Sequence, residues 1–167
     1  ENIKKTFVCS LEHALRPEYK GGFDVVIGNP PYGAYLDIKS KSFYSKNIKT
    51  FQGNYEIYFF FIELISSILK AHGKIGYITP DTWISIPQAK KLRIHVLNNY
   101  GINNIVSFNR SVFADASLNP IVFILSLRDL ETKCKVTSFD ISNNGIGIIS
   151  NENYVDIENW IASEDKQ

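Results

Sequence analysis

The strongest constraint on the fold is an apolar run that stops abruptly at a rigid polar turn, within residues 23–32. Residues 25–27 are Val-Val-Ile, and consecutive β-branched residues are typical of a parallel strand covered on both faces. Two prolines follow, and because neither can donate a hydrogen bond to a sheet ladder, the strand must end there. Sites in α/β proteins lie just beyond the carboxyl ends of strands, so the Asn-Pro-Pro-Tyr turn at residues 29–32 is the candidate site.

This turn presents two fixed hydrogen-bond acceptors and a flat ring. The prolines fix φ at Pro30 and Pro31 and push the preceding residues toward extended geometry, which preorganises the Asn29 side chain and the Pro30 carbonyl. Two such acceptors suit a planar primary amine, because they localise its lone pair for attack and stabilise the positive charge that develops. Tyr32 would stack on the ring that carries the amine. The alternative is a proline-rich turn in which Asn29 is only a turn former.

The turn resembles motif IV of the DNA amino-methyltransferases, which transfer a methyl group from S-adenosylmethionine to an exocyclic nitrogen. Its Asn-Pro-Pro-Tyr form is similar to the adenine-N6 enzymes of the TaqI-like gamma class. The resemblance covers roughly residues 7–127 and implies that Asn29, Pro30 and Tyr32 are catalytic and that Pro31 contacts the substrate. RNA methyltransferases and glutamine methyltransferases of release factors share the tetrapeptide, so an RNA base and a protein glutamine remain alternative substrates.

Two further regions take their interpretation from this resemblance. Residues 110–120 correspond to motif VIII, where Phe113 falls at the position of the aromatic that stacks on a flipped base. Phe113 and Tyr32 would then clamp an extruded adenine, or Phe113 would only plug the sheet edge. Arg110 nearby would meet phosphate or only solvent. Cys9 and Ser10 occupy the position of motif III and are candidate cofactor contacts, although neither offers the carboxylate expected there and Cys9 suits a structural role.

Residues 33–53 have no hydrophobic period, which predicts a long loop that is functional or mobile. The loop's lysines, among them Lys39 and Lys41, alternate with aromatic residues, a composition that suits phosphate contact and base stacking. The alternative is a solvated run of charges. The net charge of the chain is only +1, so any surface for nucleic acid must be local.

The remaining pattern predicts an α/β fold, the C-terminal half of a Rossmann-like S-adenosylmethionine-dependent methyltransferase sheet with flanking helices. A helix is expected over residues 54–71, with Gly73 just after it as the signal that terminates it. A strand over residues 74–80 then completes a βαβ crossover from the first strand. A capping box at residues 85–88 starts a helix that runs to Asn99. Its inward residues are Leu92, Val96 and Leu97, and its outward residues are Lys90, Lys91 and Arg93. Strands are expected over residues 102–108 and 121–127.

Length and composition bound the organisation. The 167 residues suit one domain, which we divide into a partial catalytic domain at residues 1–130 and an exit segment toward a missing recognition domain at residues 131–167. The chain has no methionine and no Gly-x-Gly cofactor turn upstream of the Asn-Pro-Pro-Tyr turn, so we expect an excerpt that lacks most of the cofactor pocket and is inactive alone. Its cut apolar sheet edge predicts self-association.

The leading hypothesis is a DNA adenine-N6 methyltransferase domain of a restriction–modification enzyme, which in the parent protein would be fused to an endonuclease or separate from one. Its partners would be double-stranded DNA and S-adenosylmethionine. Cys9 and Cys134 match no metal or redox spacing, which favours a reducing cytoplasm, and no apolar run reaches the length of a membrane span. A non-catalytic DNA-binding relic of the fold is the third hypothesis.

Overall fold

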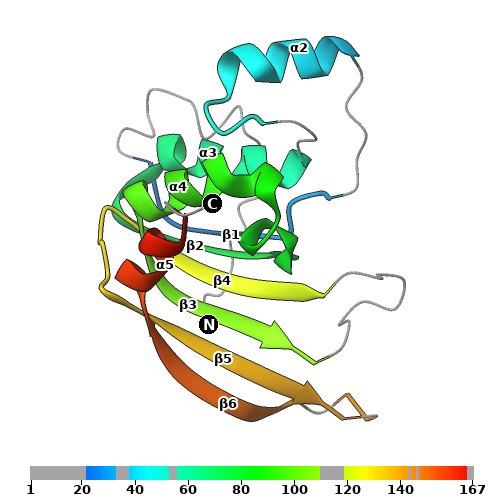
Figure 1. The fold of residues 1–167 in the computed structure, drawn as a ribbon, viewed down its shortest axis with the longest axis vertical. Coiled ribbons are helices and arrows are strands. Elements are labelled where there is room, and N and C mark those ends of the chain that lie inside the picture. Colours follow the sequence, from blue (N-terminus) through cyan, green and yellow to red (C-terminus); the bar gives the residue numbers. More distant parts are fainter. Residues whose placement is uncertain are drawn as a thin grey trace, which may run out of the picture.

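The computed structural model describes residues 22–32, 38–52, 56–109, 119–142, 144–145 and 147–164 (Figure 1). Its strands form one mixed sheet of six, in the order β1-β2-β4-β3-β5-β6. The strands are β1 (Phe23–Gly28), β2 (Leu69–Pro80), β3 (Tyr100–Phe108), β4 (Pro120–Leu127), β5 (Lys133–Ile141) and β6 (Gly147–Asp156). The helices are α2 (Ile38–Asn47), α3 (Ile57–Ile68), α4 (Lys90–Asn99) and α5 (Ile157–Glu164), with 3-10 turns η1 (Asp81–Ile84) and η2 (Pro87–Ala89). The predicted α/β sheet with flanking helices is confirmed.

The strand directions confirm the expected crossover and place an antiparallel strand in the middle of the sheet. β1 and β2 pair in parallel, so the chain between them returns across the sheet as predicted. β4 lies between β2 and β3 and is antiparallel to both. β5 continues the sheet parallel to β3, and β6 closes it antiparallel to β5. The carboxyl ends of β1, β2 and β3 therefore meet the start of β4 at one edge of the sheet.

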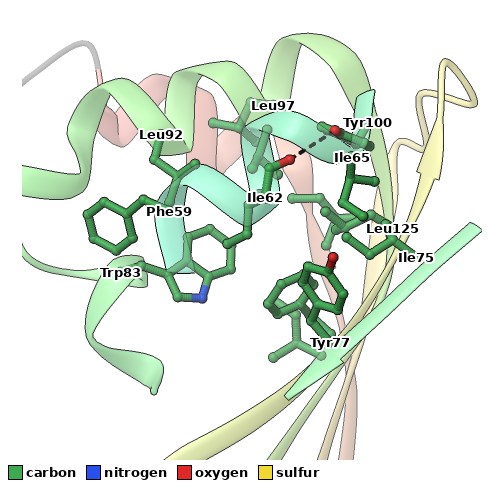
Figure 2. Close-up of a cluster of buried hydrophobic side chains, with 14 of the residues drawn as sticks. Phe59, Ile62, Ile65, Ile75, Tyr77, Trp83, Leu92, Leu97, Tyr100 and Leu125 are labelled. Carbon is green, nitrogen blue, oxygen red and sulfur yellow. Dashed lines mark hydrogen bonds between the residues drawn. The ribbon is translucent and has the colours of Figure 1, made fainter. Parts of the chain in front are cut away.

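One apolar core lies between the sheet and α3, α4 and α5, which cover the same face (Figure 1). Alternation in the strands supplies half of the core, because every second residue of β2 and β4 points toward the helices. Figure 2 shows this packing, in which the Tyr100 hydroxyl donates to the carbonyl oxygen of Ile62 at 3.2 Å. The largest side chains at its centre are Trp83, Tyr58, Tyr100, Phe59 and Phe123.

β1 differs from its prediction in burial. A strand covered on both faces was expected, yet Val25 is 61% exposed and Ile27 is 79% exposed, whereas Val26 between them packs against the core. Within the described residues, β1 is at the edge of the sheet with β2 as its one neighbour, and the described helices cover a single face of it. β4 is closer to expectation, since its helix-facing residues are buried and the others, such as Val122, are half-buried.

Three expected boundaries are corrected. The helix predicted over residues 54–71 ends at Ile68, and β2 already begins at Leu69, so Gly73 lies within a strand and does not terminate a helix. Residues 38–47 form α2, where a loop was predicted. The capping box predicted at residues 85–88 is absent, because the turn η2 separates Ser85 from α4 and neither η2 nor α4 has a side-chain cap.

Gly73 fits where it does because two backbone oxygens approach it. A Cβ at this position would lie 2.9 Å from the carbonyl oxygens of both Phe23 and Lys70, so β1 or β2 would have to shift. We expect Gly73→Ala to lower the free energy of unfolding by about 1–2 kcal/mol through overpacking. Urea denaturation followed by circular dichroism measures this change. The same substitution at Gly145, whose Cβ would meet nothing within 4 Å but whose φ is +77°, separates backbone strain from crowding.

Arg93 is also corrected. The prediction placed it outward on α4, but it is 1% exposed. Its guanidinium Nη1 donates to the carbonyl oxygens of Trp83 at 3.1 Å and Ile86 at 2.7 Å. Both residues lie in the turns that follow β2. Lys91 is exposed, and Leu92, Val96 and Leu97 are buried, as predicted. Arg93 therefore ties α4 to the carboxyl edge of the sheet.

Residues 131–167 contain more regular structure than an exit segment requires. β5 lies in this part of the chain, and β6 pairs with it over nearly its full length. α5 follows β6, and its first residue, Ile157, is buried in the core. This part of the chain therefore extends the sheet, and the division at residue 130 and the recognition domain stay predictions.

Candidate active site

The Asn-Pro-Pro-Tyr turn lies directly beyond the carboxyl end of β1. Gly28, the last residue of β1, pairs with Tyr77 of β2, so the turn begins beside the last residues of β2. Pro30 is buried and Tyr32 is half-buried against the core, which fixes both ends of the turn. Asn29 between β1 and Pro30 is exposed. Within the described ranges its carboxamide makes no hydrogen bond, so both its donor and its acceptor are available to a ligand.

The turns beyond β2 follow the strand that pairs with β1. The hydroxyl groups of Tyr58 and Thr82 lie 3.2 Å apart, and burial raises the pKa of Tyr58, so its phenol stays neutral and serves as a hydrogen-bonding group. The backbone N–H of Asp81 donates to the carbonyl oxygen of Asn119 at 3.0 Å. This bond joins the end of β2 to the residue before β4. Asp81 thus lies in a turn that links strand ends.

The predicted phosphate contacts Lys39 and Lys41 lie on α2, and both are exposed. α2 begins six residues after Tyr32, and Figure 1 shows it standing away from the sheet, beyond α3. Tyr44 attaches the helix to α3, because its ring centroid lies 5.4 Å from that of Phe60. The structure therefore presents these lysines on a helix that follows the turn in the sequence and packs on α3.

Four predicted site residues fall outside the described ranges. They are the cofactor candidates Cys9 and Ser10 and the substrate candidates Arg110 and Phe113. The clamp of Tyr32 and Phe113 therefore stays a prediction. Of the clamp, the structure describes Tyr32, and of the residues between β3 and β4 it describes Asn109 and Asn119.

A pocket of about 430 Å³ lies elsewhere on the helix-covered face of the sheet. Its walls come from η1, β3, β4, β5, β6 and α5, and they include Asp81, Cys134 and Trp160 but none of residues 29–32. Burial raises the pKa of the Cys134 thiol to about 11, so the thiol is not a nucleophile near neutral pH. The pocket is mostly apolar, so the Asn-Pro-Pro-Tyr turn remains the candidate site.

The described residues contain no group of three or more His, Cys, Asp or Glu side chains placed to hold a metal ion. No helix among them has both the length and the apolar character needed to cross a membrane.

Comparison with known proteins assigns the chain to a family. The family described as Eco57I restriction-modification methylase matches residues 1–113, which include the Asn-Pro-Pro-Tyr turn, α2, α3, β2, α4 and β3. The chain belongs to the Eco57I restriction-modification methylase family. The resemblance inferred from residues 29–32 is thereby confirmed at the level of restriction-modification methyltransferases.

Relatives of this Eco57I-family chain are restriction-modification enzymes. It is 29% identical to the type II restriction enzyme and methyltransferase RM.Eco57I of Escherichia coli, over 99% of this chain and 15% of that protein. It is 28% identical to the type II methyltransferase M.HincII of Haemophilus influenzae, over 86% of this chain and 30% of that protein. The chain thus spans less than a third of the length of either relative.

The fold of the Eco57I-family chain also occurs in solved structures. The type IIG restriction endonuclease BpuSI superposes with a TM-score of 0.71 at 18% identity, over 90% of this chain and 21% of that one. The methyltransferase subunit of a type I restriction-modification system from Streptococcus thermophilus gives a TM-score of 0.60 at 19% identity, over 91% of this chain and 34% of that one. These likenesses support the α/β methyltransferase fold.

Two residues that shape the site were missed from the sequence. Arg93 holds the turns beyond β2, and its position three and four residues before Val96 and Leu97 indicates the buried face of α4. Glu63 accepts hydrogen bonds from the backbone of the segment after α2. The sequence offers no pattern for that contact, because a single carboxylate on a helix is most often solvated.

Proposed function

We propose that this chain is the substrate-binding part of a DNA adenine-N6 methyltransferase that uses S-adenosylmethionine. The observation that carries the proposal is the Asn-Pro-Pro-Tyr turn in an Eco57I-family chain, at the carboxyl end of a parallel strand. The exposed Asn29 carboxamide has no hydrogen bond in the described part of the chain, and Pro30 beside it is buried. An acceptor that is available and a backbone that is fixed are what binding of an exocyclic amino group requires.

In the proposed mechanism the turn activates the amino group without removing a proton first. The Asn29 side-chain oxygen and the Pro30 carbonyl oxygen accept its two N–H hydrogens, which localises the nitrogen lone pair. The nitrogen would become positively charged as it takes the methyl carbon, whose bond to the cofactor sulfur would break so that S-adenosylhomocysteine leaves, and the same two oxygens would stabilise that charge. The proton is lost to solvent afterwards. Tyr32 stacks on the purine, and Phe113 would close the opposite face of the flipped base.

S-adenosylmethionine supplies an electrophilic methyl group bound to a positively charged sulfur. The described residues fit a role on the acceptor side of this reaction, since Asn29 and Pro30 offer neutral oxygens and no nucleophile of their own that the methyl group would modify. Cys9 and Ser10 are proposed to contact the cofactor. We further propose that a longer parent protein completes the cofactor pocket and provides target recognition, because the chain spans 15% of RM.Eco57I and 30% of M.HincII.

Double-stranded DNA is the proposed substrate. Lys39 and Lys41, exposed on α2, would contact phosphates, Arg110 would do so beside Phe113, and Pro31 would line the base site. Relatives named as type II methyltransferases and as combined restriction enzymes and methyltransferases support DNA over RNA or a protein glutamine. RM.Eco57I, by its name, joins cleavage and methylation, and fusion to an endonuclease is proposed for the parent on that ground. The activity is proposed to be cytoplasmic.

The test is methyl transfer from labelled S-adenosylmethionine to DNA, RNA and a release factor, measured in parallel for this chain and for the longer protein. We expect label from the longer protein in DNA, recovered as N6-methyladenine, and none from this chain alone. Label in RNA or in the release factor would keep the chemistry of Asn29 and replace the substrate. Binding of S-adenosylmethionine by the longer protein without transfer to any of the three would favour the non-catalytic alternative.

A further inference from the structure

α2 has two faces of different character. Tyr44 packs against Phe60 of α3 and attaches one face to the protein. The other face is formed by residues spaced three and four apart, which lie together on an α-helix. We call it the outer face of α2, and its residues are Lys39, Ser42, Phe43 and Lys46. All four are exposed, and Phe43 retains 61% of its surface.

The charge on this segment has one sign. Residues 38–52 contain Lys39, Lys41, Lys46 and Lys49 and no aspartate or glutamate. The two lysines of the outer face are seven residues apart, which is two turns of helix or about 10 Å. An exposed aromatic ring lies between them at Phe43. Two cations on either side of a flat apolar group suit a polyanion that also offers apolar surface, and the backbone of DNA offers phosphates and sugars.

The segment after α2 is held in place by Glu63 of α3. The Glu63 Oε1 atom accepts the backbone N–H of Lys49 at 3.0 Å, and the Oε2 atom accepts the backbone N–H of Thr50 at 2.8 Å. Thr50 is 2% exposed, so this contact is partly shielded from water. Lys91 adds a third tie, since its Nζ donates to the carbonyl oxygen of Phe51 at 3.4 Å. With Tyr44, these bonds fix both the face and the end of α2.

We propose that the outer face of α2 docks on the sugar-phosphate backbone of duplex DNA, and that Glu63 is a positioning residue for this contact. The proposal rests on the proposed function, because it takes DNA as the substrate. It assigns roles to Lys46, Phe43 and Glu63 in addition to Lys39. Lys39 and Lys46 neutralise phosphates, Phe43 packs on the sugars between them, and Glu63 holds the helix so that the three reach the duplex together.

The first experiment measures binding of this chain to a fluorescent duplex by anisotropy, over a range of salt concentrations. We expect Lys39→Ala and Lys46→Ala each to weaken binding several-fold and to reduce the slope of log affinity against log salt by about 1. Phe43→Ala should weaken binding while leaving the slope unchanged. Lys133→Ala, at the start of β5 and remote in sequence from α2, is the matched control and should bind as the unaltered chain does. No binding by the unaltered chain at low salt would overturn the proposal, as would lysine variants that match the control.

The second experiment tests Glu63 through hydrogen exchange and binding together. Glu63→Gln keeps the size of the side chain but leaves one acceptor in place of two, so the amides of Lys49 and Thr50 should exchange faster. DNA binding should weaken several-fold at unchanged salt slope, because the lysines remain but are less well held. A thermal melt identifies a variant that has merely unfolded, and Glu63→Asp, which keeps the charge but shortens the reach, should fall between. Faster exchange with unaltered binding would overturn the role of Glu63.

Binding and methyl transfer are read separately, so the two proposals can fail independently. Methylation of DNA by the longer protein, with outer-face variants that bind DNA normally, would reject the role of α2 alone. If these variants lose DNA binding but methyl label is found only in RNA or protein, DNA is rejected as the substrate of the reaction. The proposal that the outer face of α2 docks on DNA is then retained.

Discussion

Asn29→Ala is expected to reduce methyl transfer by the longer protein about 10²–10³-fold or more, with DNA affinity nearly unchanged. The substitution removes the acceptor that localises the lone pair of the target nitrogen, and no described side chain is hydrogen-bonded to Asn29 to replace it. The backbone of the turn is retained, because Pro30 is buried and Tyr32 packs against the core. Single-turnover transfer and anisotropy measure the two effects on one preparation.

The control for this prediction is Asn98→Ala, which removes an exposed asparagine from α4 and should leave both transfer and binding unaltered. Asn29→Asp adds a second test, because a carboxylate accepts hydrogen bonds as well as the amide but carries a charge into the site. We expect it to retain more transfer than Asn29→Ala. Full activity of the alanine variant would reject the mechanism at the turn, whatever the substrate proves to be.

Arg93→Met is expected to lower the free energy of unfolding by about 3 kcal/mol, because hydrogen bonds from a charged donor contribute about 1.5–3 kcal/mol each and two are lost. Methionine fills the space of the aliphatic stem but leaves the carbonyl oxygens of Trp83 and Ile86 without their donor. These oxygens belong to the turns that follow β2, so the carboxyl edge of the sheet should loosen with them. Urea denaturation gives the stability, and hydrogen exchange locates the loosening.

Asn98→Met is the matched control, since Asn98 lies on the same helix but is exposed, and its change should stay within about 0.5 kcal/mol. Arg93→Lys should recover part of the loss, because an ammonium group can still donate to one or both oxygens. An unfolding midpoint of Arg93→Met equal to that of the control would show that the buried guanidinium is not a structural tie.

The sequence predicted well where one residue type determines local geometry. The prolines end β1 at the observed place, and the buried alternation of β2 and β4 follows from apolar residues in strands. α2 could not be predicted, because Tyr44 is the one inward residue among its described side chains, so the helix has almost no apolar period. The end of α3 was placed too late because a glycine after a helix usually terminates it, whereas Gly73 makes room for the Phe23 carbonyl oxygen.

The candidate site shows the same division. Residues 29–32 are adjacent in the chain, so their shared location needed no tertiary structure. Glu63 and the backbone of Lys49 and Thr50 come together through the packing of α2 on α3. Arg93 of α4 donates to the carbonyl oxygen of Trp83 in the turn η1. Contacts from a side chain to distant backbone groups depend on the fold and carry no signature in residue type.

The antiparallel position of β4 sets the order in which this sheet can assemble. In the finished sheet β4 lies between β2 and β3, although it comes after both in the chain. Leu125 of β4 pairs with Ile75 of β2 and with Ile102 of β3, so neither pair can form before β4 has been synthesised. Contacts over such sequence distances slow folding, because the intervening chain must be closed into a loop first. On the ribosome, β2, which supports the strand that leads to Asn29, therefore lacks its second neighbour until β4 has emerged, and β5 and β6 come from the part of the chain that follows.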